Sequence, residues 1–368
     1  MGTLYHYTSV DGFEGIVKNN AIRMTKSEFL NDPNDCHLFV KLIRKYLDKH
    51  KEYVKGLIES LNSNNSEIEE LYETKDCDLI RYVEYIQKNI GLYVLSLTNR
   101  EDEMNMWNYY GHGGIQLKFQ EEKLVDSLCG TFVSEKEFLT GANVIYANTE
   151  LDIEKISVPD FSQFVLMNRE SKNIFNEHRA FIKEKSLYEA DHLYSTSNLG
   201  NFINIYLKSY ISSLEYLFKE QIINVNTPSN KVFDSIFDNI SKLNSFLYWK
   251  HDLSLYMLVL SALIKSDTYK YEDEYRIVYF EHSINSSKKK KEEYGVKSIG
   301  DNRFLYPYIT FDMKNKLDKS LESVVVSPIT KNLPIDNTIY CNTLKSFLVS
   351  KGLDESVIVE YSKHVIRW

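Results

Sequence analysis

Residues 4–35 read "LYHYTSVDGFEGIVKNNAIRMTKSEFLNDPND" and contain the clearest fold signal in the chain. Residues 4–8 predict a short strand, and Ser9 is placed to cap a helix whose apolar residues have helical spacing. The sequence "AIRMTK" at 21–26 then predicts a second strand. The same stretch concentrates side chains that stack and form hydrogen bonds, which suits either a ligand site or a turn.

Further strands are predicted on both sides of two long helical segments. The helical segments cover residues 36–90 and about 160–265, where apolar residues recur every three or four positions. Strands at the two ends of the sequence are expected to share one sheet, because neither group alone makes a good core. The strands are predicted at "GLYVLSLT" (91–98), "GGIQLKF" (113–119), "ANVIYA" (142–147), "EYRIVYF" (274–280), "LYPYITF" (305–311), "LESVVVSP" (321–328) and "SVIVEYS" (356–362).

This pattern predicts an α+β protein in three sequential parts. Residues 1–150 form the N-terminal half of a catalytic-like core, interrupted by the helical insertion at 36–90. Residues 151–265 form a second helical insertion, which is expected to pack on the core as a bundle. Residues 266–368 supply the strands that complete the core.

Composition limits the classes of function. The net charge of −8 gives no overall electrostatic case for non-specific nucleic-acid binding, although it leaves room for a local basic groove. The four cysteines are far apart and form no C-x-x-C pair, so neither a metal site nor a disulfide framework is expected. The longest apolar run, at 253–264, is too short to span a bilayer. With no signal-peptide pattern either, a cytoplasmic protein without membrane contact is expected.

The first candidate group for chemistry is Tyr5-His6-Tyr7-Thr8. On a strand, His6 and Thr8 point to one face while the two tyrosines point to the other. An imidazole beside a hydroxyl suits a ribose or phosphate oxygen. The alternative is a half-buried edge strand whose histidine is satisfied by the backbone.

The second group is "MNMWNYYGHGG" at 104–114. Trp107 and Tyr110 are three residues apart on a short predicted helix, and therefore on one face. The glycines that follow permit close approach of a backbone. The two rings suit either the core or a platform for a flat ligand.

The third group is "YKYEDEYRIVYF" at 269–280. Glu272, Glu274 and Arg276 alternate along a predicted strand, so they are expected to share one face. A carboxylate held by arginine stays ionised and oriented. Paired carboxylates of this kind favour chemistry at a sugar C1, where a fixed negative charge stabilises developing positive charge. The alternative is a solvent-facing strand with ion pairs across it.

Taken in order, these motifs resemble a bacterial family known as domain of unknown function 2971. The family has an L-Y-H-Y-T-S-like first strand, a G-I helix, N-D-P, a strand ending in S-L-T, M-W-x-x-Y and a late E-x-E-x-R strand. In this chain, Asn34-Asp35 stands where a glutamate usually follows N-D-P. The matching residues are Tyr5 to Ser9, Gly15-Ile16, Asn31-Asp32-Pro33, Ser96 to Thr98, Met106-Trp107 with Tyr110, and Tyr269, Glu272, Glu274 and Arg276.

The pattern is also similar to the ADP-ribosyltransferase fold of the His-Tyr-Glu clade, a split β-sheet core, here with large helical insertions. That resemblance implies NAD as the ligand, with His6 and Thr8 holding the adenosine ribose and Tyr110 stacking on nicotinamide. It implies Glu274 at the nicotinamide-ribose 2′-hydroxyl and Glu272 orienting the acceptor. The implied catalytic residues are Glu274, Glu272, Tyr110 and His6, and the implied NAD-binding residues are His6, Thr8, Tyr110, Trp107, Asn31, Asp32 and Arg276.

The expected function is that of an NAD-dependent ADP-ribosyltransferase-like effector in phage defence or a toxin system. It would modify a nucleic-acid or protein acceptor, or hydrolyse NAD. One alternative is a catalytically silent nucleotide-sensing module that signals to a regulatory protein partner, and another is a nuclease or phosphotransferase. The transferase interpretation requires His6, Tyr110 and Glu274 to line one cleft.

Overall fold

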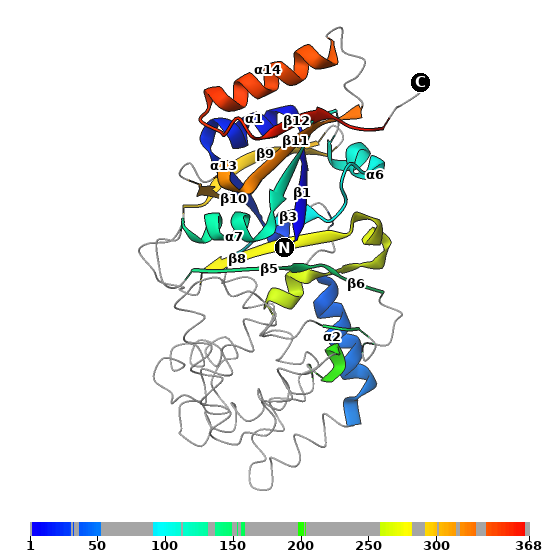
Figure 1. Ribbon diagram of the computed structural model, residues 1–368. Helices are drawn as coiled ribbons and strands as arrows, with labels where there is room; N and C mark the ends of the chain where they lie inside the picture. The colour runs from blue at the N-terminus through cyan, green and yellow to red at the C-terminus, as the bar shows by residue number, and fades with distance from the viewer. Residues whose placement is uncertain are drawn as a thin grey trace.

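The computed structural model is shown in Figure 1. It describes residues 2–30, 32, 37–52, 91–111, 113–131, 137–148, 153, 156–158, 198–201, 203, 258–281, 291–299, 302–313, 317–328 and 336–364.

The N-terminal stretch folds as its sequence predicts. Strand β1 (Thr3–Thr8) leads into helix α1 (Val10–Asn19), and β2 (Ala21–Lys26) follows. The Ser9 side chain accepts a hydrogen bond from the backbone N–H of Gly12 and so caps α1. The helix ends at Asn20, whose left-handed backbone (φ 47°) turns the chain into β2.

The remaining elements include every other strand that the sequence predicts. The stretch predicted as one strand at 142–147 is two, because β5 ends at Asn143 and β6 begins at Ile145. In chain order the elements are 3₁₀-helix η1 (Ser27–Phe29), α2 (His37–Lys49), β3 (Leu92–Thr98), α6 (Met104–Met106), π-helix η2 (Trp107–Gly111), β4 (Ile115–Gln120), α7 (Glu121–Cys129), β5 (Glu137–Asn143), β6 (Ile145–Ala147), β7 (Ile264–Ser266), 3₁₀-helix η5 (Asp267–Glu272), β8 (Glu274–Glu281), β9 (Glu293–Ile299), β10 (Asn302–Asp312), α13 (Leu317–Ser320), β11 (Leu321–Val326), α14 (Asn337–Ser350) and β12 (Ile358–Tyr361).

Strands from both ends of the sequence share one mostly antiparallel sheet, which confirms the α+β class. The order is β12-β11-β4-β1-β3-β2-β10-β9, with β8 also on β3 and β5 beyond β8. Among the described strands of this sheet, only β11 and β12 pair in parallel.

Strand β3 is the point at which the sheet divides. One of its edges pairs with β8 from Leu92 to Thr98. The other edge is shared, because β1 pairs with it at Thr98 whereas β2 pairs with it at Tyr93 and Val94. Strands β1 and β2 therefore diverge from opposite ends of β3. A gap opens between them over the middle of that strand.

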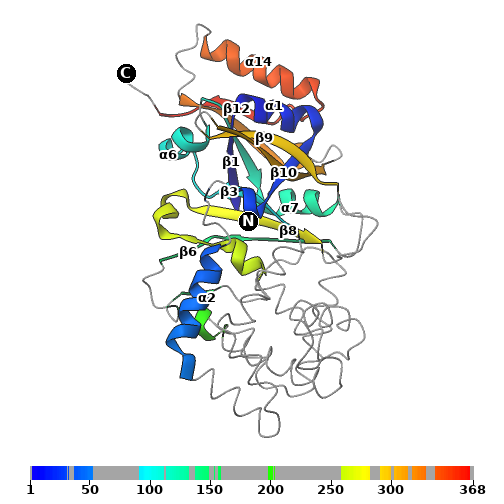
Figure 2. The same cartoon turned by 180° about the vertical axis from the view of Figure 1, so that it is seen from behind.

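The main hydrophobic core fixes this arrangement. Phe13 and Val17 of α1 and Leu344 and Leu348 of α14 are buried in the same cluster as apolar residues of the sheet. Helices α1 and α14 lie together beyond one end of the sheet, and β8 and β5 lie toward α2, as both views show (Figures 1 and 2). Each fully buried large apolar side chain contributes about 1.5–3 kcal/mol relative to exposure, so the sheet that carries the gap is well supported.

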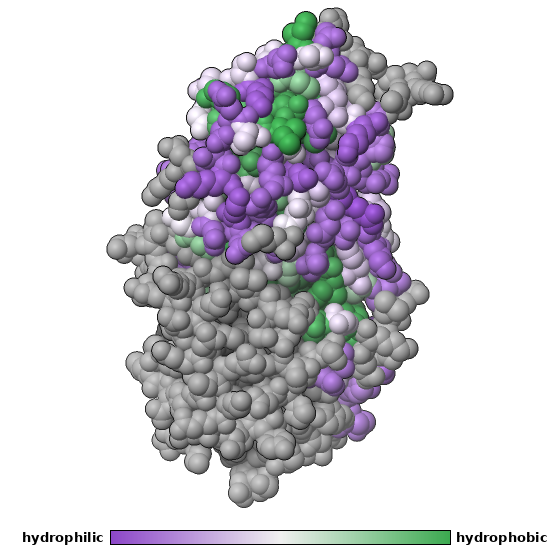
Figure 3. Space-filling model, viewed as in Figure 1, coloured by the Kyte–Doolittle hydropathy of each residue, from purple (hydrophilic) through white to green (hydrophobic). Residues whose placement is uncertain are grey.

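Several predictions fall largely outside the described residues. They are the helices at 53–90 and the bundle at 160–257, whereas 258–263 is helical and buried and leads into β7. Within the described chain, no helix is long and apolar enough to cross a membrane. The described surface in Figure 3 is largely polar on the face shown.

Candidate functional site

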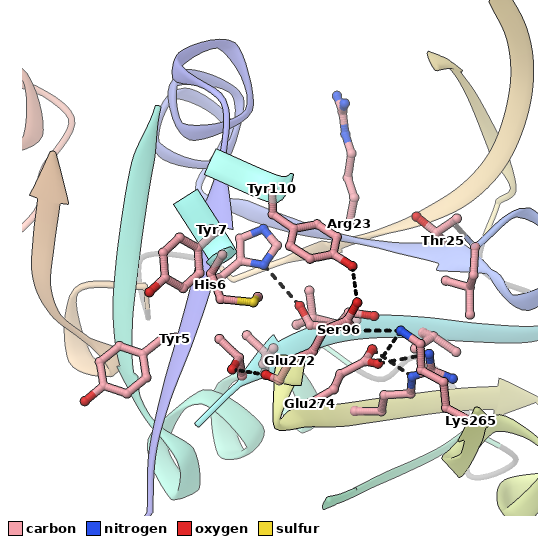
Figure 4. Close-up of a pocket in the computed structure, with 17 residues that line it drawn as sticks. Tyr5, His6, Tyr7, Arg23, Thr25, Ser96, Tyr110, Lys265, Glu272 and Glu274 are labelled. Carbon is pink, nitrogen blue, oxygen red and sulfur yellow. Dashed lines mark hydrogen bonds and ion pairs between the residues drawn. The ribbon is translucent and has the colours of Figure 1, made fainter. Parts of the chain in front are cut away.

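A pocket of about 220 Å³ lies in the gap between β1 and β2 (Figure 4). Residues of β1, β2, β3, η2, β7, η5 and β8 line it. His6, Tyr110 and Glu274 are all among them, so the expectation that they line one cleft is met. We call the β3, β7, η5 and β8 side, with its ion pairs, the floor, and the β1 and β2 sides the lips.

His6 is held on the β1 lip by the backbone of β3. Its Nδ1 lies 3.2 Å from the carbonyl oxygen of Ser96, at the middle of β3 where neither lip pairs with that strand. A carbonyl only accepts hydrogen bonds, so Nδ1 carries the proton. Burial lowers the pKa of His6, which keeps the ring neutral at pH 7. Its Nε2 is then an acceptor for a ligand hydroxyl.

Glu272 and Glu274 both reach the pocket, as predicted, but Glu272 lies on a different element from the one predicted. Glu272 does not alternate with Glu274 along one strand, since it is the last residue of the 3₁₀-helix η5. Asp273, in a left-handed conformation (φ 45°), separates it from the start of β8. This turn brings both carboxylates to the floor, where they are 3% and 4% exposed.

Glu274 is fixed as an ionised carboxylate. Its Oε1 lies 2.8 Å from Nε of Arg276, and its Oε2 lies 3.1 Å from an outer nitrogen of the same guanidinium. Burial alone would raise the pKa of Glu274. The charges of Arg276 and Lys265, with hydrogen bonds from Arg276 and Ser96, outweigh burial and lower this pKa to about 2.

Lys265 joins the two carboxylates, a role that sequence reasoning missed. Its Nζ lies 2.6 Å from Glu272 and 3.1 Å from Glu274. With Arg276, the floor therefore holds two buried acids and two buried bases. Removing two charges from water is costly unless they are paired and hydrogen-bonded, as they are here.

Tyr110 connects the helical side of the pocket to the floor. Its hydroxyl donates to Oε1 of Glu272 at 2.5 Å. Burial and the charge of Glu272 raise the pKa of Tyr110 far above its ordinary value, so it remains a neutral donor.

Trp107, the first residue of this helix, packs in the core and does not line the pocket. Its ring is fully buried and packs edge-on against Tyr7, with centroids 4.8 Å apart. Its indole N–H donates to Asp102 at 2.8 Å, and Asp102 also accepts from the backbone N–H of Lys363. The chain after β12 is thereby tied to the loop before Tyr110.

The other residues implied as NAD-binding are placed differently. Arg276 lines the pocket, and its guanidinium also donates to the carbonyl of Ala262 at 2.5 Å. Thr8 lies against Gly12 of α1 and is not part of the pocket lining. Asp32 is buried away from the lining, and Asn31 lies outside the described residues.

The β2 lip carries two polar residues that sequence reasoning missed. Arg23 and Thr25 line the pocket, and they alternate with the buried Ile22 and Met24. The Arg23 guanidinium lies 4.6 Å from the ring centroid of Tyr308. The alternation in "AIRMTK" was a usable signal, because it separates one polar face from one buried face.

Among the described residues, no group of three or more histidine, cysteine, aspartate or glutamate side chains is arranged to hold a metal ion.

One comparison with known proteins finds a match. The family model described as "Protein of unknown function (DUF2971)" matches residues 106–277, and this is the family that the motifs of the chain resemble. The match includes Tyr110 and the four charged residues of the floor, but not β1, β2 or β3. No curated protein and no solved structure matches the chain.

Proposed function

We propose that the protein is an NAD-dependent ADP-ribosyltransferase or NAD glycohydrolase that acts as an effector in phage defence or a toxin system. The observation that carries this proposal is the convergence of His6, Tyr110 and Glu274 on one pocket. The three residues come from distant parts of the sequence, and their order and residue types resemble those of the His-Tyr-Glu clade. The division of the sheet at β3 also suits a split-sheet transferase core.

The residues present fit NAD by their chemistry. The enclosed volume of about 220 Å³ is below the roughly 300–1,000 Å³ of clefts that bury a drug-sized ligand. It suits one ring with its sugar, while the rest of a dinucleotide follows the open gap. Tyr110 offers a ring to a flat base, and Nε2 of His6 offers an acceptor to a ribose hydroxyl.

The floor has the charge that glycosidic cleavage needs. Bound NAD would supply a C1′–N bond whose cleavage releases nicotinamide and leaves positive charge on the ribose. Glu274 holds a fixed negative charge without further reorganisation, since Arg276 already orients it. In this proposal, Glu272 orients the attacking hydroxyl of water or a macromolecule and takes its proton as the new bond to C1′ forms.

The first test is turnover. The full-length protein should release free nicotinamide from NAD, measured by chromatography. Labelled NAD incubated with protein and cell extract then identifies the acceptor, as label in the nucleic-acid or protein fraction or as free ADP-ribose. Absence of nicotinamide release with and without extract would refute the proposal.

A nucleotide-sensing module is the second candidate, and one observation favours it. Every carboxylate oxygen of Glu272 and Glu274 already has a partner in the floor. A fully paired floor suits binding without chemistry. Saturable NAD binding in calorimetry, with no nicotinamide released, would identify this function and a need for a regulatory protein partner.

A further inference from the structure

We infer that Arg23 and Thr25 of β2 form a phosphate subsite, so that the pocket selects a ligand bearing a phosphate or diphosphate group. The inference rests on the proposed function only for the identity of the whole ligand. It assigns the β2 lip a separate task from that of His6 on the β1 lip.

The placement of the two side chains supports this assignment. Arg23 and Thr25 project from β2 into the lining, while Ile22 and Met24 between and beside them are buried in the core. Figure 4 shows Arg23 reaching away from Glu272 and Glu274. A ligand whose sugar lies at the floor can therefore extend its phosphate toward the β2 lip without meeting the two carboxylates.

One cation of the pocket, Arg23, is available to bind an anionic ligand. Lys265 is bound to both floor carboxylates, and Arg276 is bound to Glu274. Among the described residues, Arg23 has no carboxylate partner, and its guanidinium lies over the Tyr308 ring. Three cations thus line the pocket with two carboxylates, and neutral His6 adds no charge. The surplus positive charge is at Arg23.

The guanidinium is also preorganised for an oxyanion. Tyr308 is 5% exposed and belongs to β10, which pairs with β2 through Tyr308–Thr25 and Thr310–Arg23. A guanidinium stacked on a ring keeps its in-plane N–H groups free, and these match two phosphate oxygens at once. The Thr25 hydroxyl on the same face adds a donor.

The test uses inorganic pyrophosphate and ADP as probes in calorimetry with the full-length protein. Arg23→Gln should weaken binding of both by about 10- to 100-fold, the scale of hydrogen bonds to a charged group. Arg303→Gln is the matched control, because it removes an exposed arginine from the neighbouring strand β10 away from the pocket. It should leave both affinities unchanged.

A second pair of variants tests the geometry of the subsite. Arg23→Lys keeps the charge but loses the planar fork, so it should recover only part of the affinity. Tyr308→Phe keeps the stacked ring and should bind as wild type. Equal binding by wild type and Arg23→Gln, or no pyrophosphate binding by wild type, would overturn the subsite.

Turnover separates this inference from the proposed function. Arg23-dependent binding of pyrophosphate without nicotinamide release supports the subsite and refutes the enzyme. Nicotinamide release that is equally efficient from NAD and from nicotinamide riboside, and unaffected by Arg23→Gln, supports the enzyme and refutes the subsite. If both stand, Arg23→Gln should raise the KM for NAD and leave the KM for nicotinamide riboside unchanged.

Discussion

On the pocket floor, Lys265 and Arg276 are buried against Glu272 and Glu274. On the β2 lip, Arg23, which lines the pocket, is exposed and lies over the ring of Tyr308. The floor must be paired, because an isolated buried charge is very costly. The lip carries no such requirement. The ion pairs of the floor are therefore weak evidence for a particular ligand. The positive charge of Arg23 on the lip, which no carboxylate of the described residues balances, indicates an anionic ligand.

The two regions also differ in their relation to the family. The four charged residues of the floor and Tyr110 lie within the matched residues 106–277, whereas β3 and both lips lie before them. The match thus covers Glu272 and Glu274, which are assigned to chemistry, and Tyr110, but neither His6 nor Arg23. Variants of the floor and of the lips are expected to fail in different ways.

The largest effect is expected from Glu274→Gln. Nicotinamide release should fall by about 10²-fold or more, since one preorganised charge is lost from the transition state. Stability should fall by about 3–5 kcal/mol, because Lys265 and Arg276 then face one carboxylate. Steady-state kinetics and urea unfolding measure the two losses.

A double variant separates these losses. Glu274→Gln with Lys265→Met restores the balance of charge and should regain much of the stability but none of the activity. Glu14→Gln removes an exposed carboxylate paired with Lys18 and should cost only about 0–1 kcal/mol. Full activity in folded Glu274→Gln would contradict the role of this residue.

The next effect is the acid sensitivity of the floor. The pKa of Glu274 is about 2 in the folded protein, below its ordinary 4.5. Its ionisation therefore stabilises the fold above about pH 4.5, and this stability is lost as the pH falls toward 2. The difference corresponds to about 3 kcal/mol. Unfolding followed from pH 5 to pH 2 should show this component in wild type, and Glu274→Gln should lack it.

Tyr110→Phe tests the link between the helix and the floor. The change keeps the ring and removes a hydrogen bond to a charged acceptor, so it should cost about 1.5–3 kcal/mol of stability. NAD affinity should change little if the ring alone stacks on the ligand. Thermal unfolding and calorimetry measure both, and an unchanged melting temperature would show that Glu272 does not need this donor.

The smallest effect on stability is expected on the lip. Arg23→Gln removes an exposed side chain whose contact is the ring of Tyr308, so the unfolding free energy should fall by no more than about 1 kcal/mol. The variant should nevertheless bind pyrophosphate weakly. A loss of stability comparable to that of Glu274→Gln would erase the contrast between lip and floor.

Much of the fold was predictable because β-strand alternation and helical spacing are local signals. The strand at 321–328 and the capped helix after Ser9 are examples, and both are present. Glu272 was placed on the wrong element because a residue spacing of two does not reveal a 3₁₀-helix followed by a left-handed residue. Lys265 was missed because its significance depends on carboxylates that only the tertiary fold brings to it.

The division of the sheet has a consequence for how the width of the pocket is encoded in the sequence. Both lips are encoded within residues 3–26, with only α1 between them. The opening of the pocket is thus specified by one contiguous segment of the chain, residues 3–26. A shift of β2 by two residues along β3 would change the distance from Arg23 to His6 while Glu272 and Glu274 stay in place. Related chains that differ in residues 3–26 alone are therefore expected to accept ligands of different size.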